Sequence, residues 1–109
     1  AYYLSLRKIN LEKAKKMSYK CNELEKDNGT YQDTYAWILY ELADYEQAKI
    51  WMQKSLANGS DVSAVVVEHY GDILYKNDDK DKALENWQKA KDLGSDSKEL
   101  ERKINDQKL

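Results

Sequence analysis

The chain repeats itself at a spacing of 35 residues. Residues 34–52 have the sequence TYAWILYELADYEQAKIWM, and residues 69–87 have the sequence HYGDILYKNDDKDKALENW. The residues shared by the two copies are Tyr35, Ile38, Leu39, Tyr40, Asp44 and Ala48, which recur as Tyr70, Ile73, Leu74, Tyr75, Asp79 and Ala83. Self-similarity at this period is typical of a small unit that cannot bury its apolar side chains alone and stacks on a copy of itself. The sequence therefore predicts a stacked array of repeats.

Each copy has the pattern of a helical hairpin. The apolar residues of its first half follow the i, i+3, i+4, i+7 spacing of one helix face, as at Tyr35, Ile38, Leu39 and Leu42. Asp44 in the first copy, and the Asn and Asp residues of the cluster 77–79 in the second, can cap a following helix. That second helix ends at Gly59 or Gly94, where a glycine is expected just past a helix. Two helices per repeat are therefore predicted.

Composition favours helix throughout the chain. The 109 residues include no proline and only 4 glycines, and 35% of them are charged. We therefore expect an all-α fold in a single domain. The formal net charge of −2 lacks the basic excess that a phosphate backbone attracts, so nucleic acid is not an expected partner. No apolar run approaches the roughly 18–20 residues that span a bilayer, so we expect no membrane insertion by this segment.

The spacing of small and large residues resembles that of a known family. The residues that fall on the tetratricopeptide repeat pattern are Gln32, Tyr35, Ala36, Leu39, Ala48, Met52 and Ser55 in the middle copy, and Val67, Tyr70, Gly71, Leu74, Ala83, Trp87 and Ala90 in the last. The chain looks most similar to uncharacterised bacterial proteins of this family. The resemblance implies a right-handed α-solenoid of antiparallel helix pairs, in which Ala36 or Gly71 lets the helices of a hairpin approach closely.

The repeat period also divides the chain into units. The resemblance places a partial repeat at residues 1–28, full repeats at 29–63 and 64–94, and a C-terminal capping helix at 95–109. Counting back one period, we expect Asn10 to cap the second helix of the partial repeat, whose first helix would be residues 1–8. Cys21 then falls where Ser55 and Ala90 stand, and we expect it to be buried as a small residue.

The resemblance implies a binding face as well. In the family, the first helices of successive repeats line a concave groove that holds a peptide or protein segment. The residues expected on this face are Tyr3, Leu6, Arg7, Thr30, Asp33, Trp37, Tyr40, Glu41, Val65, Glu68, Asp72, Tyr75 and Lys76. Aromatic residues are favoured at binding surfaces, although tyrosines at helical spacing also pack between repeats.

These residues indicate what kind of partner the face would hold. Acids and aromatic rings together favour a segment with Lys or Arg beside apolar residues, because cations can pair with the acids or lie over the rings. The function expected from the sequence is a non-catalytic protein-interaction module without a cofactor. The partner's identity and the cellular compartment stay open, since a single cysteine fits either side of a membrane.

Two other functions remain open from the sequence. The repeats could form the terminal stack and cap of a longer solenoid whose binding surface lies upstream. Leu6, Ile9 and Tyr19 would then lack their covering helix, and the chain would self-associate. Alternatively, Glu68, His69 and Asp72 on one helix could serve as metal ligands or as a base with its orienting group. Catalytic sites draw on several elements, however, so no catalytic or metal-binding residue is expected.

Overall fold

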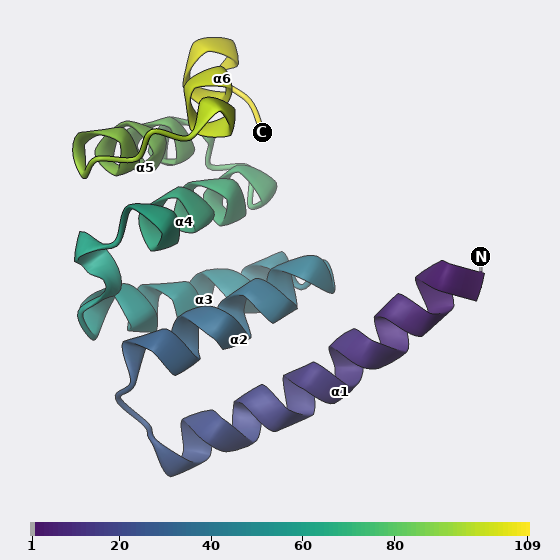
Figure 1. Cartoon of the computed structure of the whole chain (residues 1–109). Helices are drawn as coiled ribbons and strands as arrows, with labels where there is room; N and C mark the ends of the chain where they lie inside the picture. The colour runs from purple at the N-terminus through teal and green to yellow at the C-terminus, as the bar shows by residue number, and fades with distance from the viewer. Residues whose placement is uncertain (1) are drawn as a thin grey trace.

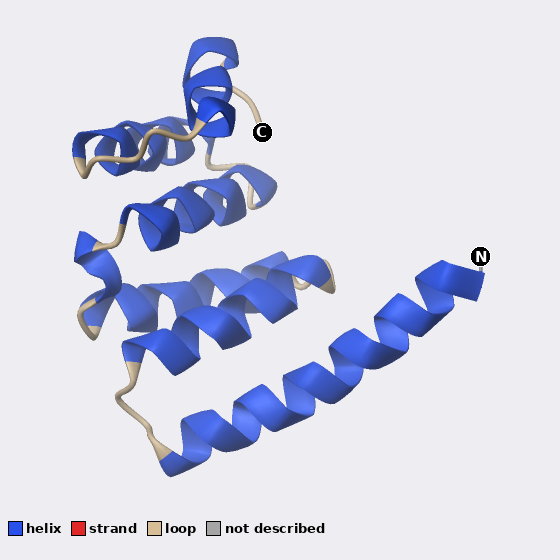
Figure 2. Cartoon of the chain, in the orientation of Figure 1, coloured by secondary structure: helices blue, strands red, loops and turns tan. Residues whose placement is uncertain are grey.

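The computed structural model describes the backbone of residues 2–109 and the side chains of residues 8–109. Its helices are α1 (Tyr2–Leu24), α2 (Gly29–Glu41), α3 (Tyr45–Ala57), α4 (Ala64–Lys76), α5 (Lys80–Asp92) and α6 (Lys98–Asp106), with a 3-10 turn η1 (Ser60–Val62) between α3 and α4. No strand occurs in residues 2–109 (Figure 2). The prediction of an all-α fold is confirmed.

The helices pair and stack in chain order (Figure 1). α2 packs along α3 and α4 packs along α5, and each pair is joined by a tight turn. α1 packs on α2 at one end of the stack and diverges from it toward the N-terminus, whereas α6 packs on α5 at the other end. The predicted antiparallel hairpins are thus present. Among the helices described, none combines the length and the apolar character needed to cross a membrane.

Side-chain caps and left-handed glycines set the ends of the helices. Asp44 and Asp79, both predicted as caps, accept a hydrogen bond at 3.4 Å from the backbone N–H three residues further on. Each of these bonds satisfies a donor that the helix itself leaves unpaired. Gly59 and Gly94 follow α3 and α5 with φ angles of 102° and 105°. Glycine adopts this region without strain, so the predicted helix ends are confirmed.

Small residues allow the helices of each hairpin to pack closely. Ala36, Ala48 and Ala83 are fully buried, as the family pattern implies. Gly71 on α4 is the tightest point, because an added Cβ there would lie 2.5 Å from the indole of Trp87 on α5. The largest core side chain of the second hairpin therefore lies directly against the backbone of α4.

The predicted helix break at Asn10 is wrong, because α1 runs without interruption from Tyr2 to Leu24. The turns inside the two hairpins use residues with positive φ, namely Ala43 at 64° and Asp78 at 63°. No glycine or proline interrupts residues 2–24, so the helix continues past Asn10. The N-terminal unit is one long helix and not a partial hairpin.

The predicted burial of Cys21 is also wrong, since this thiol is exposed. Its equivalents Ser55 and Ala90 are buried within their own hairpins, and the Ser55 hydroxyl donates to the carbonyl of Gly29 on α2 at 2.6 Å. In the part of the chain that the structure describes, α1 packs on α2 and has no first helix of its own to cover this face. Cys21 therefore has the repeat position of Ser55 and Ala90, but its side chain is exposed to solvent.

Candidate partner-binding face

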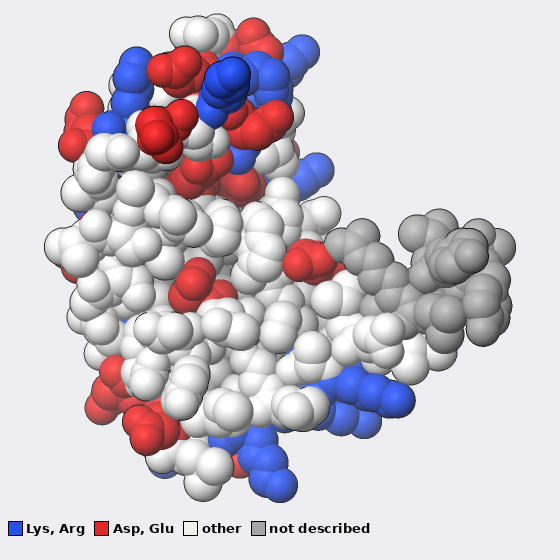
Figure 3. All heavy atoms as spheres, viewed as in Figure 1, with Lys and Arg blue, Asp and Glu red and all other residues white. Residues whose placement is uncertain are grey.

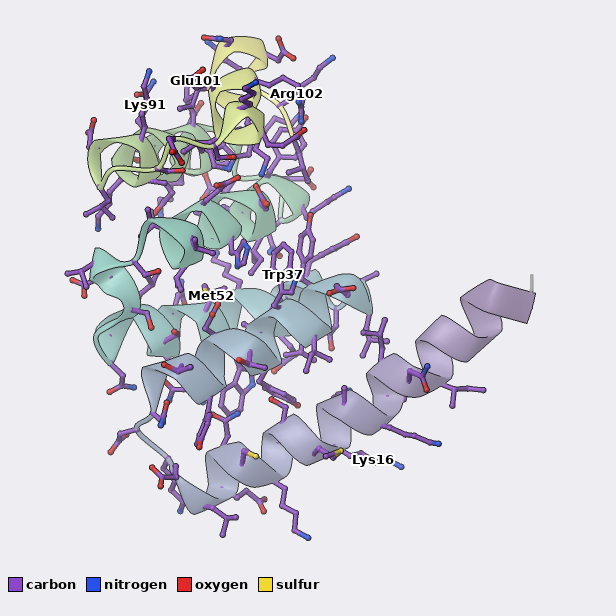
Figure 4. The ribbon with its side chains drawn as sticks, in the orientation of Figure 1. Lys16, Trp37, Met52, Lys91, Glu101 and Arg102 are labelled. Atoms are coloured by element: carbon purple, nitrogen blue, oxygen red, sulfur yellow. The ribbon has the colours of Figure 1, made fainter. Side chains whose placement is uncertain are left out.

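Three aromatic rings form a row between α2 and α4, and Trp37 projects from α2 toward α4 (Figure 4). The indole of Trp37 stacks on the ring of Tyr40 with centroids 4.6 Å apart, and on the imidazole of His69 with centroids 3.9 Å apart. The interplanar angles are 13° and 17°. Trp37 is therefore the middle ring of the row, in contact with one ring from its own helix and one from α4. That a partner's cation lies over these rings stays a prediction.

Two polar atoms beside this aromatic row lack a partner. Asp33 lies one helical turn before Trp37 on α2, and its carboxylate Oδ1 is 4.0 Å from the imidazole Nδ1 of His69 on α4. Both atoms are buried, and neither has a hydrogen-bond partner. An unsatisfied buried polar atom costs about 1–3 kcal/mol. The two atoms therefore face each other across the contact of α2 with α4, out of reach of solvent.

Tyr40 connects the aromatic row with the next group of acids. Its ring packs edge-on against Tyr45 with centroids 5.4 Å apart, so it also contributes to packing within its own hairpin. Burial, the negative charge of Asp72 and the neighbouring Tyr45 together raise the pKa of Tyr40 to about 12. The phenol is consequently neutral at physiological pH, and its hydroxyl keeps its proton beside the acids.

The acids of the last repeat are bound within the chain. Lys103 on α6 places its Nζ 2.8 Å from Glu68 Oε2, and 3.0 Å and 3.1 Å from the two carboxylate oxygens of Asp72. The indole N–H of Trp87 donates to the same Asp72 carboxylate at 3.0 Å. Asp72 and Lys103 are only 4% and 7% exposed. The expectation that Glu68 and Asp72 are open groove residues is therefore wrong, because α6 covers them.

The charges of this cluster determine how tightly it holds protons. Two carboxylates, Glu68 and Asp72, share the one ammonium of Lys103, so the cluster keeps a net negative charge. Burial raises the pKa of Asp72, and the ammonium of Lys103 only partly offsets this effect. The hydrogen bond to Glu68 and the charge of Asp72 raise the pKa of Lys103 despite its burial. Both groups therefore bind their protons more strongly than in an unfolded chain.

The other predicted face residues lie in varied surroundings. Tyr75 stacks on Trp87 with centroids 5.9 Å apart and packs, partly buried, against the core. Lys76 is exposed and lies 5.8 Å from the ring of Tyr45. Three further predicted face residues have exposed side chains, namely Thr30, Glu41 and Val65. The last three predicted residues have side chains outside the described part of the chain, namely Tyr3, Leu6 and Arg7.

The structure does not bring the suggested catalytic residues together. His69 faces Asp33 and the aromatic row, whereas Glu68 and Asp72 face Lys103. Within the described residues, no group of three His, Cys, Asp or Glu side chains is arranged to hold a metal ion.

Charge is distributed unevenly over the surface. On the side seen in Figure 3, uncharged residues cover most of the middle of the molecule, with isolated acidic groups, while Lys and Arg gather near the two ends of the stack. Residues 8–24 of α1 hold five lysines and two glutamates, a net charge of +3. The middle of this side, over α2 and α4, therefore differs in character from α1 and α6.

A hollow of about 400 Å³ lies between α1, α2 and α3 and shares no residue with the aromatic row. Trp51 and Tyr19 contribute to its lining, together with charged residues of both signs. Two side-chain amides that line the hollow connect the turn between α1 and α2 with the hairpin of α2 and α3. Gln32 donates to the carbonyl of Lys26, and Asn58 donates to the side-chain oxygen of Gln32, each at 2.9 Å. Sequence reasoning missed this junction because its members lie in three different elements.

The sequence matches no protein-family profile and no curated protein. In structure, the chain is similar to Naa15, a helical-repeat protein with tetratricopeptide repeats, in the solved structure of Naa15/Naa10 bound to HypK-THB. The TM-score is 0.71 at 19% sequence identity, and the match covers 86% of this chain and 14% of that one. The chain spans only this small part of Naa15. At this low identity the similarity establishes the fold alone, a tetratricopeptide-like helical repeat. It does not support a bacterial origin, and the right-handed twist stays a prediction.

Proposed function

We propose that this chain is a non-catalytic protein-interaction module whose partner binds the face of α2 and α4 at the aromatic row. The observation that carries the proposal is the row itself, since Tyr40, Trp37 and His69 come from two successive repeats and lie together, only partly buried. Rigid aromatic area with polar edges is typical of interface hot spots. Naa15, which has a similar fold, is bound to other proteins in its solved structure.

The charges around the row favour a partner with Lys or Arg beside apolar residues. Asp33 places a carboxylate at one end of the row, and its side chain is 23% exposed. An acidic tail would meet like charge at this position. Because Lys103 already binds Glu68 and Asp72, these two acids are not open to a partner, whereas Asp33 lies at the row itself.

The first test is a peptide titration against the wild type and Trp37→Ala. We expect an amphipathic leucine-rich peptide with a single central lysine to bind more tightly than the same peptide with glutamate in place of lysine. Trp37→Ala should weaken binding of the lysine peptide about tenfold, as is typical of a central aromatic residue. High salt should weaken it further by screening exposed charges. Fluorescence anisotropy of labelled peptides would measure each affinity.

Trp37→Phe is the matched control, because it keeps an aromatic ring between Tyr40 and His69 and should retain most of the binding. Far-UV circular dichroism would check that both variants stay folded. Tighter binding of the glutamate peptide, or equal affinity of the wild type and Trp37→Ala, would show that the partner does not bind at this row.

One observation favours a second candidate, a structural role at the end of a longer stack. The outer side of α1 exposes large apolar residues that no described element covers, since Met17 is 71% exposed and Leu24 is 79% exposed. Ile9 is exposed as well, as predicted, whereas Tyr19, although 46% exposed, packs its ring against Trp51 of the hairpin. Uncovered apolar area of this kind is typical of a surface that contacts another helix. In this role, α1 is the junction with a further repeat.

In isolation, the same surface should cause weak self-association. We expect sedimentation to show a molecular mass that rises with protein concentration, and the double substitution Met17→Glu and Leu24→Glu to abolish the rise. Val62→Glu is the matched control, because Val62 is 74% exposed and lies on η1, far from α1 in the sequence. A wild type that stays monomeric at every concentration would contradict the prediction.

A further inference from the structure

The outer side of α1 combines exposed lysines with exposed apolar residues. The residues of α1 that are at least partly buried recur at helical spacing on the side that packs on α2, namely Leu11, Ala14, Lys15, Ser18 and Asn22. The residues that recur on the opposite side are all exposed, namely Ile9, Lys13, Lys16, Met17, Lys20 and Leu24. Figure 4 shows Lys16 pointing away from α2. This outer side is therefore a helical surface with lysine beside apolar residues.

The outer side of α1 cannot reach the aromatic row of its own chain. α1 is fixed to the hairpin by its inner side, since the amide of Asn22 donates to the carbonyl of Tyr31 on α2 at 3.1 Å. Tyr19 adds a ring contact with Trp51 on α3, with centroids 6.4 Å apart. α2 lies between α1 and α4 (Figure 1), and the row joins α2 to α4. Only another molecule can therefore bring the two surfaces together.

The two surfaces are opposite in charge. Residues 8–24 carry a net charge of +3, whereas α2 contains two acids, Asp33 and Glu41, and no basic residue. Val65 on α4 is 62% exposed, one turn before His69, and adds apolar area to the face. Opposite charge favours contact of α1 with the face of α2 and α4, and like charge disfavours contact of one α1 with another. The partner chemistry proposed for the row, lysine beside apolar residues, is thus present on the chain itself.

We propose that the face of α2 and α4 at the aromatic row binds the outer side of α1 of a second copy of this chain. This inference rests on the proposed function for the binding face and names the partner that the face holds. The two surfaces lie on different sides of each copy, so the contact is head to tail and leaves one surface unused at each end of an assembly. Self-association therefore continues beyond a dimer unless the copies close into a ring.

The test mixes two variants that each lack one of the two surfaces. Trp37→Ala removes the middle of the row, and Met17→Glu with Leu24→Glu places acids on the outer side of α1. Alone, each variant should remain monomeric at concentrations where the wild type associates. Mixed, they should form a complex of one copy of each and nothing larger, because the intact α1 of the first binds the intact row of the second. Sedimentation velocity, with a fluorescent label on one variant, would measure both results.

Further substitutions separate the contact from effects on folding. Val65→Lys is a second row variant, because Val65 is exposed and a lysine there places like charge before α1 without disturbing the core. On the copy that supplies α1, Lys13→Glu with Lys20→Glu should weaken the mixed complex about tenfold. Lys89→Glu with Lys91→Glu is the matched control, because both lysines are exposed on α5, and it should leave the complex unchanged. Far-UV circular dichroism would check that every variant is folded.

Each alternative contact gives a different result. Self-association of the row variants alone would show that α1 binds another α1, and a mixture without a complex would likewise overturn the head-to-tail contact. A wild type that stays monomeric would overturn it as well and leave a further repeat as the occupant of α1. If the mixture gives no complex while the lysine peptide still binds in a way that depends on Trp37, this inference is wrong and the proposed function stands. If the peptide is also indifferent to Trp37→Ala, the proposed function is wrong too.

Discussion

Lys103→Met is expected to lower the free energy of unfolding by roughly 3–5 kcal/mol at neutral pH, because it leaves Asp72 buried without a counter-charge. Asp72 is 4% exposed, and its remaining side-chain donor is the indole N–H of Trp87. Urea denaturation followed by far-UV circular dichroism would measure the loss. Lys98→Met is the matched control, because Lys98 is an exposed lysine on the same helix and should change stability by less than about 0.5 kcal/mol.

The double variant Lys103→Met with Asp72→Asn separates the charge effect from packing. Asparagine keeps an oxygen acceptor for the Trp87 indole and carries no charge, so the double variant should recover most of the lost stability. A double variant as unstable as Lys103→Met alone would show that Lys103 acts through packing of its aliphatic stem and not through Asp72.

The deficit of Lys103→Met should shrink on acidification. Burial raises the pKa of Asp72 above its unfolded value of 3.8, so the folded chain takes up this proton first. Stability of the variant therefore rises as the pH falls through the folded pKa of Asp72 toward 3.8. In the wild type, the pKa of Lys103 is raised above 10.5, so the contribution of the pair is present below 10.5 and is lost as the pH rises through the folded value.

Trp87→Ala is expected to be as damaging, with a loss of roughly 3–5 kcal/mol in the free energy of unfolding. Trp87 is fully buried, packs on the backbone at Gly71, and donates to Asp72, so alanine would leave a large cavity and remove one donor. The same urea denaturation would measure it. Trp37→Ala is the matched control, since that indole is only partly buried and should cost clearly less. Equal losses for the two tryptophans would contradict the assignment of Trp87 as the centre of the core.

The sequence alone determined the fold and its core, because these depend on local pattern. The period of 35 residues, the caps at Asp44 and Asp79 and the small residues at Ala48 and Ala83 each act within one hairpin or between neighbouring copies. Helix periodicity and capping are short-range effects. The assignment of Trp37 to a binding face came from the family resemblance and stays a prediction.

Only the tertiary structure decided which residues of that face are available. Lys103 lies 31 residues from Asp72, and no pattern within a repeat indicates that α6 would turn back and bind two acids of α4. The contact of Asp33 with His69 likewise joins two helices, and its geometry depends on how one hairpin stacks on the next. The repeat pattern placed Cys21 on the second helix of a hairpin, where its side chain would be buried. It could not show that α1 is one continuous helix without a partner helix to cover Cys21. Long-range pairing is set by the summed packing of whole elements, so it is the part of this protein that local sequence could not determine.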